Sequence, residues 1–330
     1  MRLGPMRLFA DAAIRANLPL PELPAVEAAG AADLAVIVEW TDVGAAVTLG
    51  THMLSWPTTN GGTAISFHMA AAGDSELRFP HRGVFTITND STRVGVHAEP
   101  GVTTETIRHL LLDQVLPRLL AHHGRLIVHG SAVQIDDRAL VFIGDSGAGK
   151  STLAASFSAD GHRLLCDDGI VLTPGKRCTM ALPTYRSLRL WPDSVAGIYP
   201  EAAPRVAPMA HYSTKQRVLV DDGSPPAPEP LPLAAVYVLS STADTKTTSI
   251  SRLSARDACM AIIRNAFQLD VTDRNRTADL MSKAGDVAEQ VPVFALSYPR
   301  GYEHLPAVRA AVLEHLAHWA ACAEQPAEGR

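Results

Sequence analysis

One short stretch, Gly144–Ser151, restricts the fold of this chain more than any other feature. It reads GDSGAGKS and satisfies the pattern G-x-x-x-x-G-K-[ST], between the apolar run Leu140–Ile143 and a helix-forming run from Thr152 to about Ala159. This pattern indicates phosphate binding where a strand runs into it and a helix leaves it. Its glycines allow successive N–H groups to curl toward phosphate oxygens, and the helix N-terminus adds a positive end. The sequence therefore predicts an α/β fold with a nucleotide-binding loop at the end of a strand.

The residue types inside the loop predict ATP and Mg²⁺ as the bound groups. In loops of this kind the lysine, here Lys150, reaches the β- and γ-phosphates, and the hydroxyl of Ser151 coordinates Mg²⁺. Lys150 is therefore also a candidate catalytic residue. The predicted nucleotide-binding residues are Gly144, Asp145, Ser146, Gly147, Ala148, Gly149, Lys150, Ser151 and Thr152.

Two adjacent carboxylates, Asp167 and Asp168, follow the next predicted strand, Arg163–Cys166. ATPases with this loop commonly place their metal-binding aspartate much farther along the chain. The short spacing here delivers both carboxylates to the mouth of the loop. One can hold Mg²⁺ and the other can accept a proton from an attacking hydroxyl. We predict that Asp167 joins Ser151 at the metal, and the sequence leaves open which of the two aspartates is the base.

A histidine lies on the strand expected beside the loop strand. The apolar runs Leu126–Ile135 and Leu140–Ile143 are separated by so short a connection that they can form only an antiparallel hairpin. His129 falls in the first run, next to Gly130, which permits close backbone approach. A lone histidine on an apolar strand is more often a core or surface residue, but this position makes His129 a candidate catalytic residue.

Composition and periodicity predict three parts in a chain of 330 residues. Residues 1–30 are rich in alanine and proline and predict a loose arm, whereas short apolar runs from 33 to about 96 predict strands. Apolar residues at helical spacing predict a helix from Thr103 or Thr104 to Gly124, kinked at Pro117. We therefore expect a β-rich N-terminal domain (1–102) that recognises substrate, a connecting helix (103–124) and a catalytic domain (125–330), with a proline-rich loop at 221–232.

Charge and hydropathy limit the partners. The net charge of −5 gives no basic footprint for nucleic acid. No run approaches the roughly 18–20 apolar residues that span a bilayer, and the first residues lack an apolar stretch of signal-peptide length. The four cysteines form no C-x-x-C pair, which suits a reducing compartment. These features predict a cytoplasmic protein that binds neither nucleic acid nor membrane, and they leave a homo-oligomer open.

Taken together, the motifs resemble the HPr kinase/phosphorylase family in its C-terminal catalytic domain. The stretch HGSAVQIDDRALVFIGDSGAGKSTLAASFSADGHRLLCDDGIVL contains a histidine-glycine strand, a GDSGxGKS loop, a GHRL turn and an Asp-Asp pair at the family's relative spacing. The resemblance implies a P-loop kinase domain of the HPr kinase/phosphoenolpyruvate carboxykinase type. It also implies that the pair Asp167-Asp168 contains the general base for a serine hydroxyl, and that His129 lies close to the transferred phosphoryl group.

The chain departs from the family at a later signature, Glu-x-Arg-Gly-x-Gly, which corresponds here to Thr184–Arg189. Thr184 replaces the glutamate, and Ser187 and Arg189 replace the glycines. The sequence LPTYRSLRLWPDS resembles a divergent branch of HPr-kinase-like proteins from peptide natural-product clusters. Some proteins of that branch resemble kinases of lasso-peptide precursors. The departure argues against reverse phosphorolysis and against HPr itself as the substrate.

The resemblance thus implies an ATP-dependent kinase that phosphorylates a serine of a peptide or protein, with a lasso-peptide precursor among the candidates. A small-molecule kinase on the same scaffold and a nucleotide-binding regulatory ATPase are the alternatives. A further cation is expected on the γ-phosphate, and the candidates are Arg186, Arg189, Lys215 and Arg217.

Overall fold

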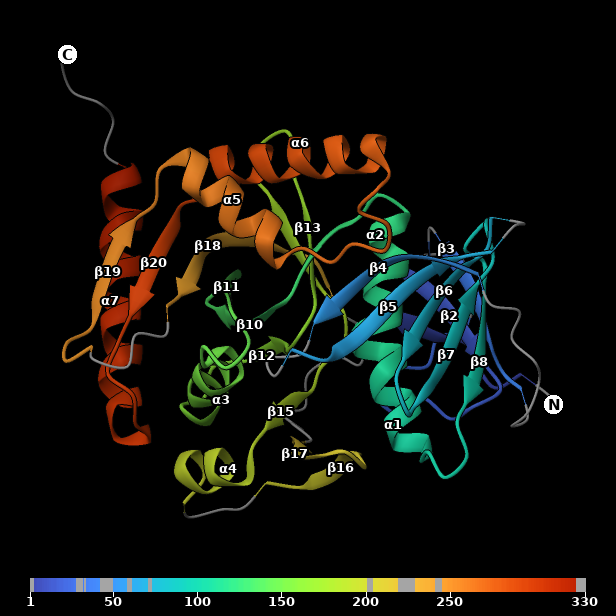
Figure 1. Ribbon diagram of the computed structural model, residues 1–330. Helices are drawn as coiled ribbons and strands as arrows, with labels where there is room; N and C mark the ends of the chain where they lie inside the picture. Colours follow the sequence, from blue (N-terminus) through green and yellow to red (C-terminus); the bar gives the residue numbers. More distant parts are fainter. Residues whose placement is uncertain are drawn as a thin grey trace.

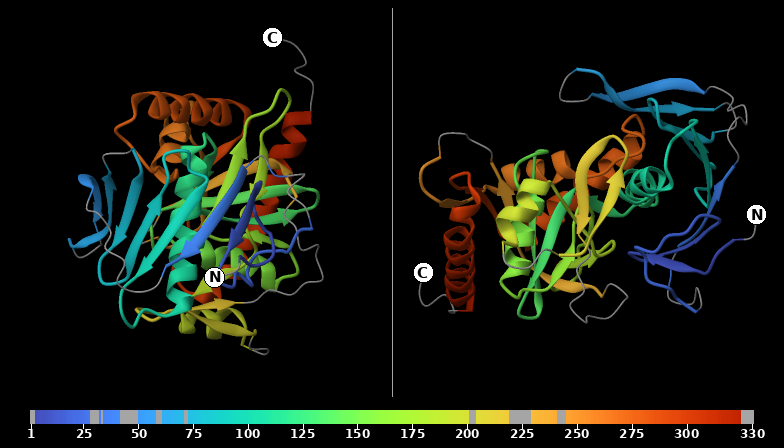
Figure 2. Two further views of the ribbon diagram at one scale, coloured as in Figure 1. Left: turned by 90° about the vertical axis from the view of Figure 1, so that its right-hand side faces the viewer. Right: turned by 90° about the horizontal axis from the view of Figure 1, so that it is seen from below.

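The computed structural model describes residues 3–27, 32, 34–41, 50–57, 61–70, 73–200, 204–218, 229–240 and 245–324. Within these residues the chain is a mixed α/β protein with sheets of eight, nine and three strands. In Figure 1 a long helical segment lies partly behind strands of the eight-stranded sheet, and the right-hand view of Figure 2 shows it between this sheet and the rest of the chain.

The eight-stranded sheet is built from the N-terminal part of the chain in the order β1-β2-β3-β8-β7-β6-β5-β4. Its strands are β1 (Arg7–Phe9), β2 (Ala12–Ala16), β3 (Leu34–Trp40), β4 (Thr51–Pro57), β5 (Thr63–Met69), β6 (Ser75–Phe79), β7 (Gly83–Ile87) and β8 (Arg93–Ala98). The strands predicted between 33 and 96 are confirmed where the structure describes them, and an apolar run at 45–49 lies outside the described residues.

The prediction of a loose arm over residues 1–30 is wrong. β1 and β2 extend the sheet beside β3, and Phe9 and Ile14 are completely buried in its core. Strands of three and five residues are too short to show a clear alternation, so sequence periodicity could not reveal them.

The connecting helix has the predicted ends and an irregular middle. Its parts are α1 (Thr104–Leu110), the π-helical segment η2 (Leu111–Val115) and α2 (Leu116–His122). The Thr103 side chain accepts the N–H of Thr106, and Gly124 leaves the helix with φ +78°. The irregularity expected at Pro117 takes the form of η2 directly before it. Proline lacks the N–H that would bond to Asp113, and a wider turn accommodates the gap.

This helix belongs to the core of the eight-stranded sheet. Its buried apolar residues, including Ile107 and Leu119, form one cluster with Phe67 and Phe85 of the sheet. Apolar residues from the second half of the chain, such as Phe267, join the same cluster. Deleting residues 1–102 would therefore expose the apolar residues of the helix that pack against this sheet.

The nine-stranded sheet carries the glycine-rich loop. Its strands are β9 (Leu126–Val128), β10 (Gly130–Ile135), β11 (Arg138–Gly144), β12 (Leu164–Cys166), β13 (Ile170–Thr173), β14 (Met180–Pro183), β18 (Leu231–Leu239), β19 (Ser249–Arg252) and β20 (Val293–Ser297). The predicted hairpin of β10 and β11 is confirmed, while β11 pairs in parallel with β18, and β18 with β20.

Helices cover both faces of this sheet (Figures 1 and 2). They are α3 (Lys150–Ala159) and α7 (Leu305–Glu324) on one face, and α5 (Ala255–Asn265) and α6 (Arg274–Gln290) on the other. Along β11, Leu140 and Phe142 pack with α3 and α7, whereas Val141 and Ile143 pack with α5 and α6. This alternation is the two-residue period of a strand buried on both sides.

The strand predicted over Leu126–Ile135 is in fact two strands that break at His129. β9 pairs with β13, whereas β10 pairs with β11 and β12. The backbone N–H of His129 instead donates to the carbonyl of Asn265 at 2.6 Å. Both strands are buried, so the apolar run continues through the break and hides it from sequence reasoning.

A small three-stranded sheet and a short helix lie below α3 in Figure 1. They are β15 (Leu188–Leu190), β16 (Val206–Ala210), β17 (Ser213–Val218) and α4 (Pro192–Ile198), while η3 (Tyr302–His304) precedes α7. Residues 219–228, which hold most of the predicted proline-rich loop, lie outside the described residues. No helix in the described part of the chain is long and apolar enough to cross a membrane.

Candidate functional site

The glycine-rich loop has the predicted strand–loop–helix setting. β11 ends at Gly144 and α3 begins at Lys150. Gly147 and Gly149 have φ values of +81° and +99°, in the left-handed region that other residues rarely adopt. The curled backbone therefore depends on glycine at these two positions.

Lys150 is folded back onto the loop. Its Nζ donates to the carbonyls of Gly144 at 2.7 Å and Asp145 at 3.0 Å, and the residue is only 6% exposed. Burial is the main cause that lowers the pKa of Lys150 to about 8, against the opposing effect of Asp167. An anion in the loop would favour the charged ammonium.

Asp167 is buried directly behind the loop. Its Oδ1 accepts hydrogen bonds from the hydroxyls of Ser131 at 2.5 Å and Ser151 at 2.9 Å, and its Oδ2 accepts the backbone N–H of Arg189 at 3.1 Å. The first carboxylate of the pair is thereby joined to the loop hydroxyl that was expected to bind metal.

Asp168 faces a different environment from its neighbour. Its φ of +69° places it in the left-handed region, which aspartate tolerates better than most residues. The chain therefore turns sharply after β12, and the carboxylate forms an ion pair with the Arg189 guanidinium and lies 3.6 Å from His129 Nε2. The described residues that line the adjacent cleft include Asp168 but not Asp167.

His129 also lines this cleft, with its ring packed edge-on against Phe267 at 5.8 Å between centroids. Desolvation, followed by the charges of Lys150 and Arg189, lowers the pKa of His129 well below its usual value. The imidazole is therefore neutral at neutral pH. It can donate or accept one hydrogen bond, but it does not supply a positive charge.

The cleft has a volume of about 600 Å³ and collects positive charge. Of the four cations expected near the γ-phosphate, Arg189 and Lys215 line it. Arg217 instead lies in a buried cluster with Tyr185, and Arg186 is not among the described lining residues. Burial and then the charge of Arg189 lower the pKa of Lys215. Like charges thus converge where phosphates would neutralise them.

Sequence reasoning missed Arg300, another cation of the cleft. It follows β20 and donates to the carbonyls of Ala148 at 3.2 Å and Gly147 at 3.4 Å. β20 is parallel to β18, which is parallel to β11, and the carboxyl ends of parallel strands meet at one sheet edge. The signal that could have found Arg300 is therefore its place just after the apolar run at 293–298.

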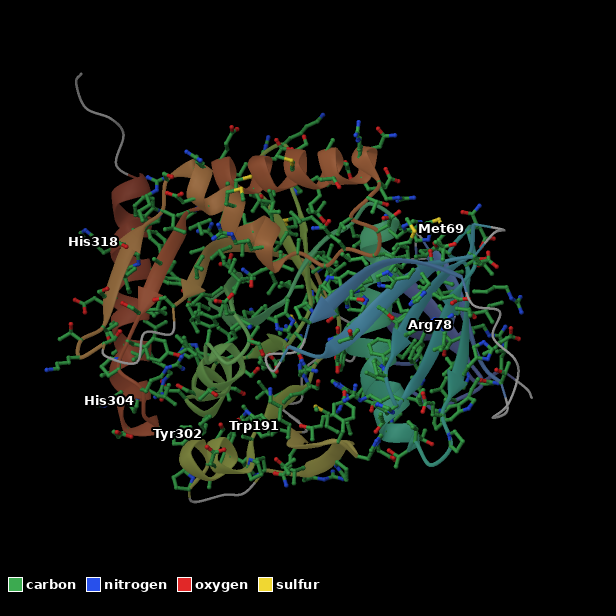
Figure 3. The ribbon with its side chains drawn as sticks, viewed as in Figure 1. Met69, Arg78, Trp191, Tyr302, His304 and His318 are labelled. Atoms are coloured by element: carbon green, nitrogen blue, oxygen red, sulfur yellow. The ribbon has the colours of Figure 1, made fainter. Side chains whose placement is uncertain are left out.

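Two aromatic residues complete the wall below α3 and are labelled in Figure 3. Trp191 is 47% exposed, with Lys215 Nζ 5.2 Å from the centre of its ring. The Tyr302 hydroxyl donates to Asp193 at 2.9 Å. An exposed tryptophan in a cleft offers a flat apolar surface to a ligand.

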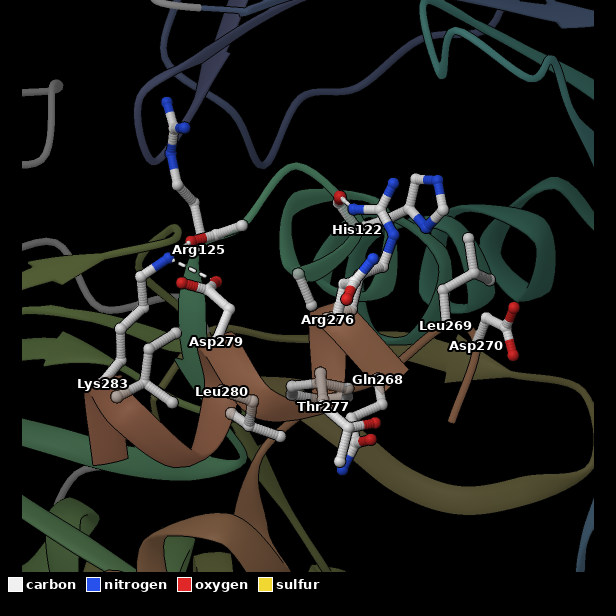
Figure 4. A pocket seen from close by; sticks show the side chains of 15 residues that line it. His122, Arg125, Gln268, Leu269, Asp270, Arg276, Thr277, Asp279, Leu280 and Lys283 are labelled. Atoms are coloured by element: carbon white, nitrogen blue, oxygen red, sulfur yellow. Dashed lines mark hydrogen bonds and ion pairs between the residues drawn. The ribbon is translucent and has the colours of Figure 1, made fainter. Parts of the chain in front are cut away.

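A second cavity of about 220 Å³ lies between α2 and α6 (Figure 4). Its cations are engaged: Lys283 Nζ donates at 2.6 Å to both the Gly124 carbonyl and the Asp279 carboxylate, and Arg276 donates to the His122 carbonyl. These contacts satisfy carbonyls at the end of α2, which is a structural role. The cleft beside the glycine-rich loop is therefore the candidate site.

The hydroxyl of Ser151 and the carboxylate of Asp167 are oxygen donors of the kind that Mg²⁺ prefers. Among the described residues no three His, Cys, Asp or Glu side chains form a metal-binding group. Nucleotide loops of this kind need no such group, because one hydroxyl, one carboxylate, phosphate oxygens and water complete the coordination. Ser151 and Asp167, whose oxygens lie 2.9 Å apart, would supply the two protein donors of that set.

Comparison with known proteins adds little to this geometry. No protein-family model matches the chain, and no curated protein does. Among solved structures the chain is similar to the Hpr(Ser) kinase/phosphatase from Coxiella burnetii, at 12% identity and a TM-score of 0.30, over 58% of this chain and 97% of that one. A likeness this weak carries no inference about activity, and the site must be interpreted from its own residues.

Proposed function

We propose that the chain is an ATP-dependent kinase that transfers the γ-phosphoryl group to a serine hydroxyl of a peptide or protein. The observation that carries the proposal is the arrangement of Ser151 and Asp167 in contact at 2.9 Å, with Asp168 on the cleft side. In this proposal Asp167 binds the metal and Asp168 serves the acceptor.

The residues of the cleft have complementary roles in this mechanism. The loop N–H groups and Lys150 would bind the β- and γ-phosphates, and Arg189 and Lys215, which line the same cleft, would bind the γ-phosphate. Bound Mg²⁺ supplies neutralisation of the phosphate charge. Phosphoryl transfer needs little covalent help, so positioning and charge dominate.

Asp168 is the proposed base. As the acceptor oxygen bonds to the γ-phosphorus and the bond to the β-phosphate oxygen breaks, the hydroxyl proton passes to the Asp168 carboxylate. Arg189 pairs with Asp168, and the γ-phosphate would compete for the same guanidinium. Neutral His129, 3.6 Å from Asp168, orients the carboxylate or the acceptor hydroxyl.

The reaction is proposed to run forward only. Thr184 stands where the signature glutamate is expected, and its hydroxyl donates to the Gly169 carbonyl at 2.8 Å while the residue is buried. It therefore stabilises the turn after Asp168 and offers no carboxylate to a metal. A reverse reaction with inorganic phosphate lacks that ligand.

The proposal is tested by incubating the protein with Mg-ATP and serine-containing peptides, lasso-peptide precursors among them, and measuring intact mass. We expect the addition of one phosphoryl group, absent from peptides in which the acceptor serine is alanine. ATP hydrolysis without a phosphorylated peptide would contradict the proposal and favour a regulatory ATPase. Phosphorylation of a metabolite alone would favour a small-molecule kinase.

Substrate recognition by the N-terminal domain is the second part of the proposal. No described residue of the eight-stranded sheet lines the cleft, whereas His109 and Gln114 of the connecting helix do. Recognition by the sheet would therefore occur outside the catalytic cleft. Substitutions on the exposed edge strand β4 are the suitable test, because deletion of the domain would expose the helix.

The loop itself gives a sharp prediction for nucleotide binding. A Cβ at Gly149 would lie 2.8 Å from the Tyr298 hydroxyl, in a backbone conformation with φ +99°. We expect Gly149→Ala to weaken Mg-ADP binding by at least roughly tenfold, because left-handed strain of about 1–2 kcal/mol adds to the steric conflict. The measurement is isothermal titration calorimetry.

Gly161→Ala is the matched control. Gly161 also has a positive φ, +96°, but a Cβ there meets nothing within 4 Å and lies at the far end of α3. It should lose similar stability in thermal unfolding while retaining normal Mg-ADP affinity. Equal affinities in the two variants would contradict the role assigned to the loop.

A further inference from the structure

A buried carboxylate outside the cleft, Asp113, is bound to a residue of the site. It lies in the π-helical segment η2 and is only 1% exposed. Its Oδ2 lies 2.7 Å from His109 Nδ1 and accepts an Arg189 Nη1 hydrogen bond at 3.0 Å, and its Oδ1 accepts the Tyr185 hydroxyl. A buried carboxylate is costly unless it is paired in this way, so its partners are firmly held.

Arg189 is the residue that joins Asp113 to the proposed active site. Its Nη1 donates to Asp113, its Nη2 pairs with Asp168, and its backbone N–H donates to Asp167. A guanidinium is planar, and two carboxylates at separate nitrogens fix both its position and its plane. Asp113 is thus the anchor on the side away from the cleft.

The π-helical segment also has a physical cause in the sequence. Pro117 cannot donate to the carbonyl of Asp113, and the widened turn of η2 takes up the missing bond. Such segments occur frequently at functional sites. Here the widened turn carries the carboxylate that binds Arg189.

We propose that Asp113 is a positioning residue for phosphoryl transfer, which holds the Arg189 guanidinium against Asp168 and toward the γ-phosphate. The inference rests on the proposed kinase function. Asp113 touches neither nucleotide nor acceptor, and it acts only through Arg189.

The test compares Asp113→Asn with Glu22→Gln. Glu22 is a second buried carboxylate of the same cluster; it accepts from Arg108 Nε at 2.9 Å and lies 3.9 Å from Arg217. No ion pair or hydrogen bond in the described residues joins it to Arg189, so its substitution reproduces the loss of a buried charge without removing a contact of Arg189. Both substitutions replace a carboxylate by an amide of the same shape.

We expect Asp113→Asn to lower kcat by roughly 10- to 100-fold, the usual range for outer partners that orient a site. The KM for ATP should change less than kcat does, because the loop N–H groups and Lys150 still bind the phosphates. Glu22→Gln should keep kcat within about threefold of the unchanged protein. Equal losses of kcat in the two variants would overturn the proposal.

A double-variant cycle separates positioning from general destabilisation. If Asp113 acts through Arg189, the pair Asp113→Asn with Arg189→Lys should lose little more than Arg189→Lys alone. Additive losses would overturn the proposal. If Asp113→Asn does not fold, Tyr185→Phe replaces it, since that change removes a donor to Asp113 and leaves Arg189 intact.

A nuclear magnetic resonance measurement distinguishes failure of the inference from failure of the proposed function. The Arg189 Nε–H signal should be sharp in the unchanged protein and in Glu22→Gln, and broadened in Asp113→Asn, whether or not a phospho-acceptor is found. A protein without kinase activity but with this pattern would refute the function and support the positioning. An active kinase whose Arg189 signal and kcat are unaffected by Asp113→Asn would support the function and refute the positioning.

Discussion

Replacing Lys150 with alanine is expected to lower kcat/KM for phosphoryl transfer by roughly 10²–10³-fold or more, the effect of removing a charge-stabilising donor. The ammonium lies inside the loop, and no other described lysine donates to its carbonyls. In the proposed mechanism its charge stabilises the negative charge that develops on the β-phosphate. The measurement is initial-rate kinetics with the acceptor peptide.

The control must account for stability, because Lys150 is 6% exposed and holds two loop carbonyls. Circular dichroism and thermal unfolding establish whether Lys150→Ala is folded, and Lys176→Ala removes an exposed lysine remote from the cleft. Lys176→Ala should retain full activity. A folded Lys150→Ala protein with undiminished turnover would refute the mechanism.

The second large effect separates the two aspartates. Asp168→Asn is expected to lower kcat by roughly 10²–10⁴-fold, the usual contribution of a general base. Asparagine also tolerates the left-handed backbone at this position, so the turn should persist. The Mg²⁺ concentration for half-maximal activity should stay the same, because Asp168 is not the residue joined to Ser151.

Asp167→Asn should behave differently. It removes the carboxylate that contacts Ser151, so we expect lower activity together with a higher Mg²⁺ requirement. Titrating Mg²⁺ at saturating ATP measures both variants. Normal transfer in both would eliminate the pair as catalytic, and a shifted Mg²⁺ requirement in Asp168→Asn alone would exchange the two roles.

The sequence by itself determined the local architecture of the site. Gly144–Ser151 requires glycine at positive φ, the flanking runs have strand and helix composition, and the hairpin before the loop follows from a short connection. The capping of the helix by Thr103 and its end at Gly124 were equally readable. Each of these features depends on residues a few positions apart, and propensity and turn chemistry act over that range.

Only the tertiary structure decided which residues far apart in the sequence are brought into contact in and around the site. Arg189 lies 76 residues from Asp113 in sequence, and Arg300 lies 152 residues from Ala148, yet each pair is hydrogen-bonded. The break at His129 and the strands β1 and β2 were hidden for the same reason, since sheet neighbours decide them. Periodicity reports which face of an element is apolar, but the partner of a buried charge is set by packing between elements.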